Sequence, residues 1–233
     1  MDETLTDSQL DALRALDTPT VCNALEVVAP QRRGHGYTVQ PFFCPRPELG
    51  SMVGSARTAT IRAMQPSEQT AAEATEVRLA YYEHIGSGTG PTVTVIEDLD
   101  PIPGYGAWWG EVNTNIHQGL GSLGVITNGS IRDLDDSAPG FHLLAGMPGP
   151  SHAWIRVEEF ACPVTVHGMT VEPGDLIHAD RHGAVVIPLD VAADVPTAAA
   201  DIATAEQRLI QASRQPGFSA ATLRELLAGG SGH

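Results

Sequence analysis

The pattern of apolar and polar residues predicts helices that alternate with strands early in the chain, and strands joined by tight turns later. Apolar residues at helical spacing predict helices over residues 6–16, 18–27, 67–85, 110–119, 191–214 and 219–228. Alternating or short apolar runs predict strands over residues 51–62, 92–98, 123–127, 161–166, 169–171, 176–179 and 183–188. Residues 30–50 are rich in proline and glycine, and we expect loops and short extended pieces there.

This order of elements predicts a single α/β domain. Because hairpins dominate late in the chain, we expect layers built on a mixed sheet and not a purely parallel, doubly wound sheet. The domain would cover residues 1–228, and the tail GGSGH (229–233) would be disordered. No GxGxxG motif follows a strand, so a dinucleotide site is not expected.

The charge of the chain restricts its partners. The formal net charge is −15, and the acidic residues are spread along the sequence. Such a chain repels phosphate backbones, so we expect no nucleic acid partner. The N-terminal sequence is acidic and polar, unlike a secretory signal, and no apolar run is long enough to span a bilayer. We therefore expect a cytoplasmic protein without a membrane partner.

The absence of one residue type restricts the chemistry. All 13 basic residues are arginines, and the chain contains no lysine. Schiff-base catalysis on the protein's own side chain needs a lysine amine, and a phosphate-binding P-loop needs its lysine. Carbanion chemistry would therefore need a metal ion or another electron sink. The cysteines Cys22, Cys44 and Cys162 lie far apart, which argues against a thiolate zinc cluster.

Two segments carry candidate chemistry. Residues 106–113 form a glycine-flanked turn that opens a predicted helix, and free N–H groups at a helix N-terminus bind carboxylates well. Residues 128–136 follow the strand over 123–127, where ligands gather in α/β sheets. There, Asp133 could ligate Mg²⁺, and Arg132 could bind a carboxylate or a developing oxyanion. The residues alone are equally compatible with a turn cap at Asp133 or Asp135 and a surface ion pair at Arg132.

A third candidate lies later in the chain. The side chains of His178, Asp180 and His182 could act as metal ligands, and alternate residues of a regular strand share one face. The alternative interpretations are a turn, or a core histidine whose hydrogen bonds are satisfied within the protein.

The order and spacing of several segments resemble one family. GAWWGE, GSLGVITNGSIRD and VTVHGMTVEPGDLIHADRHGAVVIP follow one another as in the regulator of ribonuclease activity A family, which also contains the 4-hydroxy-4-methyl-2-oxoglutarate aldolases. The resemblance runs from about Thr18 to the helix near Ile210. It implies an α/β/β sandwich of the swivelling-domain type, here with flanking N- and C-terminal helices. It also implies a homotrimer or a hexamer with active sites between subunits.

The resemblance also implies a set of site residues. In the family's aldolases, backbone amides of the glycine turn hold the pyruvyl group, which here implies a substrate-binding set of Gly110, Glu111, Val112 and Asn113. The family's arginine–aspartate pair matches Arg132 and Asp133, so both are implied to be catalytic. Asp133 would be the direct ligand of Mg²⁺ or Mn²⁺, Glu111 would hold a metal-bound water, and Arg132 would also bind substrate.

Three positions differ from the family's usual pattern. Asn128 stands where an acidic or small residue is usual, and FHLLAGMPGPSHAWIRVEEF (141–160) replaces the usual aldolase stretch. His117 lies in a helix that usually carries small residues, where it could face the substrate or serve the structure. These differences concern the identity of the substrate more than the class of reaction.

The sequence thus predicts a divalent-metal-dependent lyase that cleaves a C–C bond of a 2-oxo acid through a metal-stabilised enolate. Retro-aldol cleavage of a 4-hydroxy-2-oxo acid and decarboxylation of oxaloacetate would both fit, because both leave the pyruvate enolate. The alternative is a non-catalytic protein of the same fold that inhibits a ribonuclease by binding it. A quinone methyltransferase is not expected, because no glycine-rich adenosylmethionine loop follows an early strand.

Overall fold

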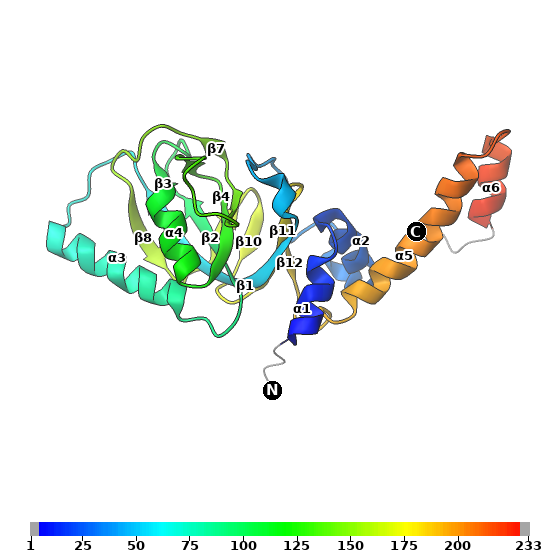
Figure 1. Cartoon of the computed structure of the whole chain (residues 1–233), viewed down its shortest axis with the longest axis horizontal. Helices are drawn as coiled ribbons and strands as arrows, with labels where there is room; N and C mark the ends of the chain where they lie inside the picture. The colour runs from blue at the N-terminus through cyan, green and yellow to red at the C-terminus, as the bar shows by residue number, and fades with distance from the viewer. Residues whose placement is uncertain (1–4, 229–233) are drawn as a thin grey trace.

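A mixed seven-stranded sheet forms the centre of the molecule (Figure 1). The computed structural model describes residues 5–228, so the tail expected to be disordered lies outside the described residues. The strands of this sheet are β1 (Met52–Arg62), β2 (Thr92–Asp98), β4 (Ser122–Thr127), β6 (His142–Leu144), β8 (Arg156–Phe160), β11 (Leu176–Asp180) and β12 (Gly183–Ile187). Strands β1, β2, β4 and β6 are parallel neighbours, while β11 and β8 pair antiparallel with the two ends of β1. The predicted mixed sheet is confirmed.

Two smaller sheets complete the strand structure. A parallel sheet consists of β3 (Ala107–Trp109), β5 (Ser130–Ile131) and β7 (Met147–Pro148). A hairpin consists of β9 (Val164–Val166) and β10 (Met169–Val171). The hairpin turns at His167 and Gly168, whose φ angles of 47° and 86° are those of a tight two-residue turn.

The helices lie in two groups (Figure 1). Their bounds are α1 (Asp7–Arg14), α2 (Thr18–Val28), α3 (Ala71–Gly86), α4 (Glu111–Gly119), α5 (Val195–Ser213) and α6 (Ala220–Ala228), with short 3-10 turns η1 (Pro30–Arg32) and η2 (Pro47–Leu49). Helices α1, α2 and the start of α5 pack beside β11 and β12, whereas α3 and α4 lie at the other end of the sheet. The rest of α5 and α6 extend away from the sheet, so the predicted flanking helices are confirmed.

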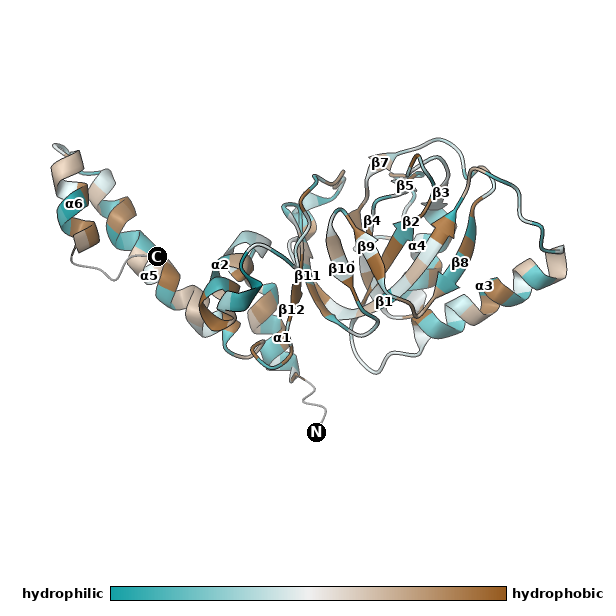
Figure 2. Ribbon diagram, turned by 180° about the vertical axis from the view of Figure 1, so that it is seen from behind, coloured by the Kyte–Doolittle hydropathy of each residue, from teal (hydrophilic) through white to brown (hydrophobic). Residues whose placement is uncertain are grey.

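The apolar side chains form three buried clusters. One lies between the central sheet and the β9–β10 hairpin, a second between the sheet and helices α3 and α4, and a third between the sheet and helices α1, α2 and α5. Figure 2 shows apolar residues along the central strands. Among the described residues, no helix is both long enough and apolar enough to cross a membrane.

The structure corrects several element boundaries. The helix expected from residue 67 begins at Ala71, because Thr70 caps it and exchanges hydrogen bonds with Glu73. The strand expected from residue 161 begins at Val164, because Ala161 has a left-handed φ of 55°. Strands β3, β5, β6, β7 and β8 were not expected. Most span only two or three residues, too few for an apolar period to show.

Candidate active site

The site begins with two short parallel strands that lie side by side. In β3 and β5, Ala107 pairs with Ser130 and Trp109 with Ile131. The side chains of Trp109 and Ile131 are fully buried, which anchors both strands. The Arg132 N–H donates to the Trp109 carbonyl oxygen at 2.9 Å and extends the pairing by one residue. Since parallel strands end at the same edge, the residues after β3 and those after β5 meet there.

Gly110 and Asp133 come together at this edge. A Cβ atom placed on Gly110 would lie only 2.5 Å from Asp133 Oδ2, and 3.2 Å from Arg132 Cγ. The Glu111 N–H donates to Asp133 Oδ2 at 3.3 Å, and Arg132 Nε lies 3.6 Å from the same oxygen. The structure therefore brings together the glycine turn and the arginine–aspartate pair, which are separated by 22 residues in sequence.

Asp133 has an unusual backbone conformation. Its φ of 51° lies in the left-handed region, which is uncommon for residues other than glycine. The turn is held because the Asp133 carbonyl oxygen accepts hydrogen bonds from the N–H groups of Asp136 and Ser137 and from the Ser137 hydroxyl. Such conformations cluster at functional sites, where the surrounding structure imposes them.

The first turn of α4 presents backbone donors. Gly110 is the N-cap and has no side chain to cap the helix, so the Asp133 carboxylate accepts from the first N–H, that of Glu111. The Asn113 side chain is already engaged: its amide donates to the Trp108 carbonyl oxygen at 2.6 Å, and its oxygen accepts from the Tyr82 hydroxyl at 2.6 Å. These bonds hold the Asn113 side chain toward Trp108 and Tyr82, which leaves its main-chain N–H as the group that would meet a ligand. The side chains of Glu111 and Val112 are exposed.

A cavity of about 380 Å³ opens beside these residues. It is lined by Ile131, Arg132, Asp133, Leu134, Pro148, Gly149 and Pro150. The side chains of Arg132 and Asp133 are 39% and 36% exposed, so both can reach a ligand in the cavity.

The side chains at the cavity can be compared with the ligands that a divalent cation requires. Within the described residues, no three His, Cys, Asp or Glu side chains gather into a metal-binding cluster. The carboxylate of Asp133 is a hard oxygen ligand at the cavity, and Glu111 starts the adjacent helix. Mg²⁺ and Mn²⁺ accept one or two carboxylates with water in the other positions. These residues fit a cation held through Asp133 and solvent.

His117 does not face the cavity. Its ring is fully buried and lies against Trp109, with ring centroids 4.5 Å apart. Its Nδ1 lies 2.6 Å from the Asn113 carbonyl oxygen, so Nδ1 carries the proton and donates. Nε2 then accepts from the Tyr81 hydroxyl at 2.6 Å. Burial lowers the pKa of His117 to about 4, so the ring is neutral and serves to hold α4.

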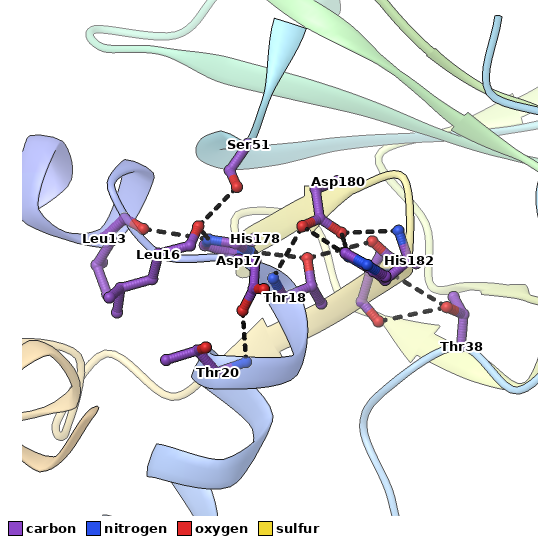
Figure 3. A network of polar contacts seen from close by, with 12 residues as sticks. Leu13, Leu16, Asp17, Thr18, Thr20, Thr38, Ser51, His178, Asp180 and His182 are labelled. Atoms are coloured by element: carbon purple, nitrogen blue, oxygen red, sulfur yellow. Dashed lines mark hydrogen bonds and ion pairs between the residues drawn. The ribbon is translucent and has the colours of Figure 1, made fainter. Parts of the chain in front are cut away.

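The segment from His178 to His182 forms a structural junction (Figure 3). His178 is buried; its Nδ1 lies 3.1 Å from the Thr18 hydroxyl and its Nε2 lies 3.2 Å from the Leu13 and Leu16 carbonyl oxygens. Burial would raise the pKa of Asp180, but hydrogen bonds from His182 and Thr18 outweigh it and lower that pKa. These contacts tie the N-terminal helices to β11 and leave neither ring nitrogen of His178 free for a metal.

One residue that shapes the site could not be found from the sequence. Arg46, from the loop before β1, donates to the carbonyl oxygens of Leu134, Ser137, Ala138 and Phe141. These bonds fix the loop that follows Asp133. No local signal could reveal this role, because Arg46 is about ninety residues away in sequence. The proline-rich lining of the cavity, Pro148 to Pro150, lies in the stretch that differs from the family's usual pattern, and nothing in the sequence indicates its place at the cavity.

Comparison with known proteins identifies the family. The pattern of the family described as "RraA-like: Aldolase/RraA" matches residues 18–186, which is most of the chain. The chain therefore belongs to the RraA-like family, as the sequence predicted.

Two solved structures share the fold. One, described as a crystal structure of novel cellulases from microbes associated with the gut ecosystem, is 17% identical with a TM-score of 0.74, and the match covers 89% of each chain. The other, RraAS2 of Streptomyces coelicolor, is described as an unusual member of the RNase ES inhibitor RraA family. It is 22% identical with a TM-score of 0.65, and the match covers 92% of this chain and 99% of that one. At these identities the likeness shows the fold alone.

One curated relative also matches. Protein DlpA of Legionella pneumophila is 29% identical over 105 residues, or 43% of this chain. The match spans only 17% of the length of that relative.

Proposed function

We propose that this protein is a divalent-metal-dependent lyase that cleaves a carbon–carbon bond of a 2-oxo acid and releases pyruvate. The observation that carries the proposal is the meeting of Gly110, Arg132 and Asp133 at one edge of a cavity. The chain also belongs to a family whose description includes aldolases, which supports the same class of reaction.

The substrate carboxylate would bind at the start of α4. The main-chain N–H groups of Val112 and Asn113 lie in a first turn whose N-cap, Gly110, has no side chain, and the positive end of the helix dipole favours an anion there. Arg132 supplies the nearby positive side chain. The 2-oxo group would then lie toward Asp133.

The reaction must stabilise the electron pair of the carbon–carbon bond that breaks. In a retro-aldol cleavage the C3–C4 bond breaks, the 4-hydroxyl loses its proton, and the bonding electrons form the enolate of pyruvate. A cation held by Asp133 would act as a Lewis acid toward the 2-oxo oxygen. The guanidinium of Arg132 stabilises negative charge that develops on that oxygen. Glu111 would hold the water that accepts the proton, and protonation at C3 then gives pyruvate. Decarboxylation of oxaloacetate would leave the same enolate.

We also propose that the protein assembles as a homotrimer or a hexamer. The cavity is open to solvent on one side in a single chain, and Arg132 and Asp133 are partly exposed. A neighbouring copy that covered this side would exclude water from the reacting groups, which strengthens electrostatic stabilisation.

Pyruvate release tests the proposal directly. Purified protein with Mg²⁺ or Mn²⁺ is incubated with 4-hydroxy-2-oxo acids and with oxaloacetate, and pyruvate is detected by a coupled assay. We expect turnover that stops when EDTA is added and returns with excess metal. Turnover in excess EDTA, with no metal found in the protein, would refute the metal dependence.

A second candidate function is the inhibition of a ribonuclease by binding. Two observations favour it: RraAS2 of Streptomyces coelicolor is described as belonging to an RNase ES inhibitor family, and this chain has a net charge of −15, which suits a basic partner. The test is RNA cleavage by an RNase E-type enzyme in the presence of the parent protein and of Asp133→Ala. Equal inhibition by both, without any pyruvate release, would favour this function over the lyase.

A further inference from the structure

The C-terminal part of the chain is helical but unpacked. Residues 203–228, which we call the arm, comprise the second half of α5 and all of α6 (Figure 1), and none of them is buried. Buried side chains in α5 end at Ile202. A helix as short as α6 is marginal in water unless one of its faces is packed. The arm therefore needs a surface that residues 5–228 of a single chain do not give it.

One face of the arm is apolar. In α6, Leu223, Leu226 and Leu227 follow helical spacing and share a face, whereas Ala221 lies on the opposite side of the helix. Phe218, in the turn before α6, is also exposed. Figure 2 shows apolar residues on both helices of the arm. An apolar face of this kind is typical of a helix that packs against another surface.

A second exposed apolar surface borders the candidate active site. It consists of four large side chains that are between 46% and 61% exposed, and we call it the rim: Ile102, Tyr105, Met147 and Trp154. The two loops that carry the rim lie side by side. A Cβ on Gly104 would lie 3.0 Å from Met147 Sδ, and the Ala107 N–H donates to the Ser151 carbonyl oxygen at 2.9 Å. Grouped apolar side chains on a surface mark sites of protein association.

The rim adjoins the open side of the cavity. The lining residues Pro148 to Pro150 lie in the same loop as the rim residues Met147 and Trp154, between them in sequence. A helix that packed on the rim would therefore also cover the mouth of the cavity.

The surface area of the chain indicates that a large interface is missing. The accessible surface of one chain is 12285 Å². A compact monomer of 24.6 kDa exposes about 10,000 Å². The difference, roughly 2,000 Å², is as large as the total area that a stable protein–protein interface buries. In a ring, each chain loses this much, because it gives its arm to one neighbour and its rim to the other.

Charge favours a second copy as the occupant of the rim. The arm carries three arginines and two glutamates, a formal charge of +1, whereas the rest of the chain carries ten arginines and 26 acidic residues. The arm can therefore approach the acidic surface of another copy without repulsion. The exposed Asp135 and Asp136, which follow the lining residue Leu134, would meet its arginines. A basic partner would be attracted to the rest of the chain and not to the arm.

We propose that the arm of one copy docks on the rim of the next copy and closes the open side of its cavity. The arm extends beyond α1 and α2, whereas β3, β5 and β7 lie on the other side of the central sheet (Figures 1 and 2), so the arm does not reach its own rim. The contact is head-to-tail, and such contacts form rings where the rotation closes. The inference rests on the proposed assembly and names the surfaces that form it.

A charge on the apolar face of α6 should weaken the assembly. The parent and the double variant Leu223→Glu/Leu227→Glu are compared by sedimentation over a dilution series at physiological salt. We expect the concentration at which the assembly is half dissociated to rise about tenfold or more, as for the loss of central interface residues. Ala221→Glu adds the same charge on the opposite face of α6 and should leave this midpoint nearly unchanged. A parent-like midpoint in the double variant, or a parent that is a single chain throughout, would overturn the inference.

The rim should respond in the same way. We expect Trp154→Glu to raise the midpoint about tenfold or more, while Leu79→Glu, at an exposed residue of α3 outside the rim, should not. All the changed residues are exposed, so each variant should fold, and circular dichroism checks this. A parent-like midpoint in Trp154→Glu would mean that the arm docks elsewhere and would overturn the inference.

A mixture of the two variants tests the head-to-tail contact. The double variant keeps its rim, and Trp154→Glu keeps its arm. We expect a complex of two chains on mixing, at a concentration where each variant alone sediments as one chain. No complex in the mixture would overturn the inference. If the parent were a single chain and bound an RNase E-type enzyme that the double variant did not bind, the arm would belong to that partner instead.

Pyruvate release separates this inference from the proposed function. A parent that assembles through the arm and the rim but releases no pyruvate would refute the lyase and leave the docking surfaces standing. A parent that releases pyruvate, with a midpoint that does not depend on Leu223 and Leu227, would do the reverse. We expect pyruvate release per chain to fall with the mass of the particle in both variants, and to stay at the parent's level in Ala221→Glu.

Discussion

At the scale of single residues, Asp133 and Arg132 have separable roles in the proposed reaction. Asp133→Ala should remove the one direct protein ligand of the cation, and metal affinity should fall with activity because a single carboxylate plus water binds Mg²⁺ weakly. A Mn²⁺ titration measures this. Asp135→Ala is the matched control, since it removes an exposed carboxylate two residues away that does not line the cavity. Parent-like Mn²⁺ affinity in Asp133→Ala would place the metal elsewhere.

For Arg132 we predict that metal affinity is kept while the chemical step slows. Arg132→Ala should leave Mn²⁺ affinity nearly unchanged, because a guanidinium has no lone pair to offer, while kcat falls by ~10²-fold or more. Arg132→Lys should restore little, because an ammonium cannot reproduce the planar fork. Steady-state kinetics beside the Mn²⁺ titration, with melting temperature as a folding check, decide the matter. Full activity in Arg132→Ala would mean that Arg132 has no role in catalysis and only forms its exposed ion pair with Asp133.

Gly110 should tolerate no side chain. The Cβ of Gly110→Ala would lie 2.5 Å from Asp133 Oδ2, so the carboxylate or the start of α4 must move. We expect a large loss of both activity and Mn²⁺ affinity in a folded protein. Gly119→Ala is the control on the same helix, because a Cβ there meets nothing within 4 Å. Equal activity in the two variants would contradict the placement of the site.

The sequence predicted part of this site. The residues after two strands, Arg132 with Asp133 and the turn at Gly110, could be expected to lie at strand ends, and the structure brings them together. Their roles in catalysis stay predictions. The contribution of Arg46 could not be predicted, because its four carbonyl partners are defined only by the folded loop.

At the scale of elements, the sequence predicted those long enough to show a period, and also the short strands β4, β9, β10, β11 and β12, which are apolar runs beside turns. The helices and the strands β1 and β2 were expected because eight or more helical residues, or seven alternating ones, give a clear pattern. Strands β3, β5 and β7, which carry the site, are too short for this, and they exist because β5 pairs with both of the others. The register of such strands depends on long-range packing.

The stability of the protein should depend on pH because His117 of helix α4 is buried. The pKa of His117 is lowered to about 4 by burial, against an ordinary value of 6.5. Between these values the unfolded chain binds a proton that the folded chain does not, so stability falls as pH drops through that window and is fully present above it. For His117 the loss is on the order of 3 kcal/mol. His117→Gln should be less stable at pH 7 and lose less stability between pH 7 and pH 5.

Urea unfolding at the two pH values measures this difference. His35→Gln, at an exposed position, is the control and should keep the parent's pH dependence. The buried His178, whose pKa is also lowered by burial, adds to the slope in all three proteins. An identical slope in His117→Gln and the parent would mean that His117 is accessible to protons in the folded chain.

At the scale of the whole molecule, the net charge of −15 and the open cavity act on assembly in opposite ways. Copies with this charge repel one another at low ionic strength, and salt screens the repulsion over about 10 Å at 0.1 M. A reaction that develops negative charge gains from a cavity closed against water, which a neighbouring copy would provide.

Light scattering tests this assembly. We expect light scattering at micromolar concentration and 0.15 M salt to give the mass of three or six chains. Dilution into low salt should lower both this mass and the activity per chain, and the two should recover together when salt is restored. The mass of one chain at micromolar concentration, with full activity, would show that a single chain contains the complete site and that the assembly expected from the family resemblance is absent.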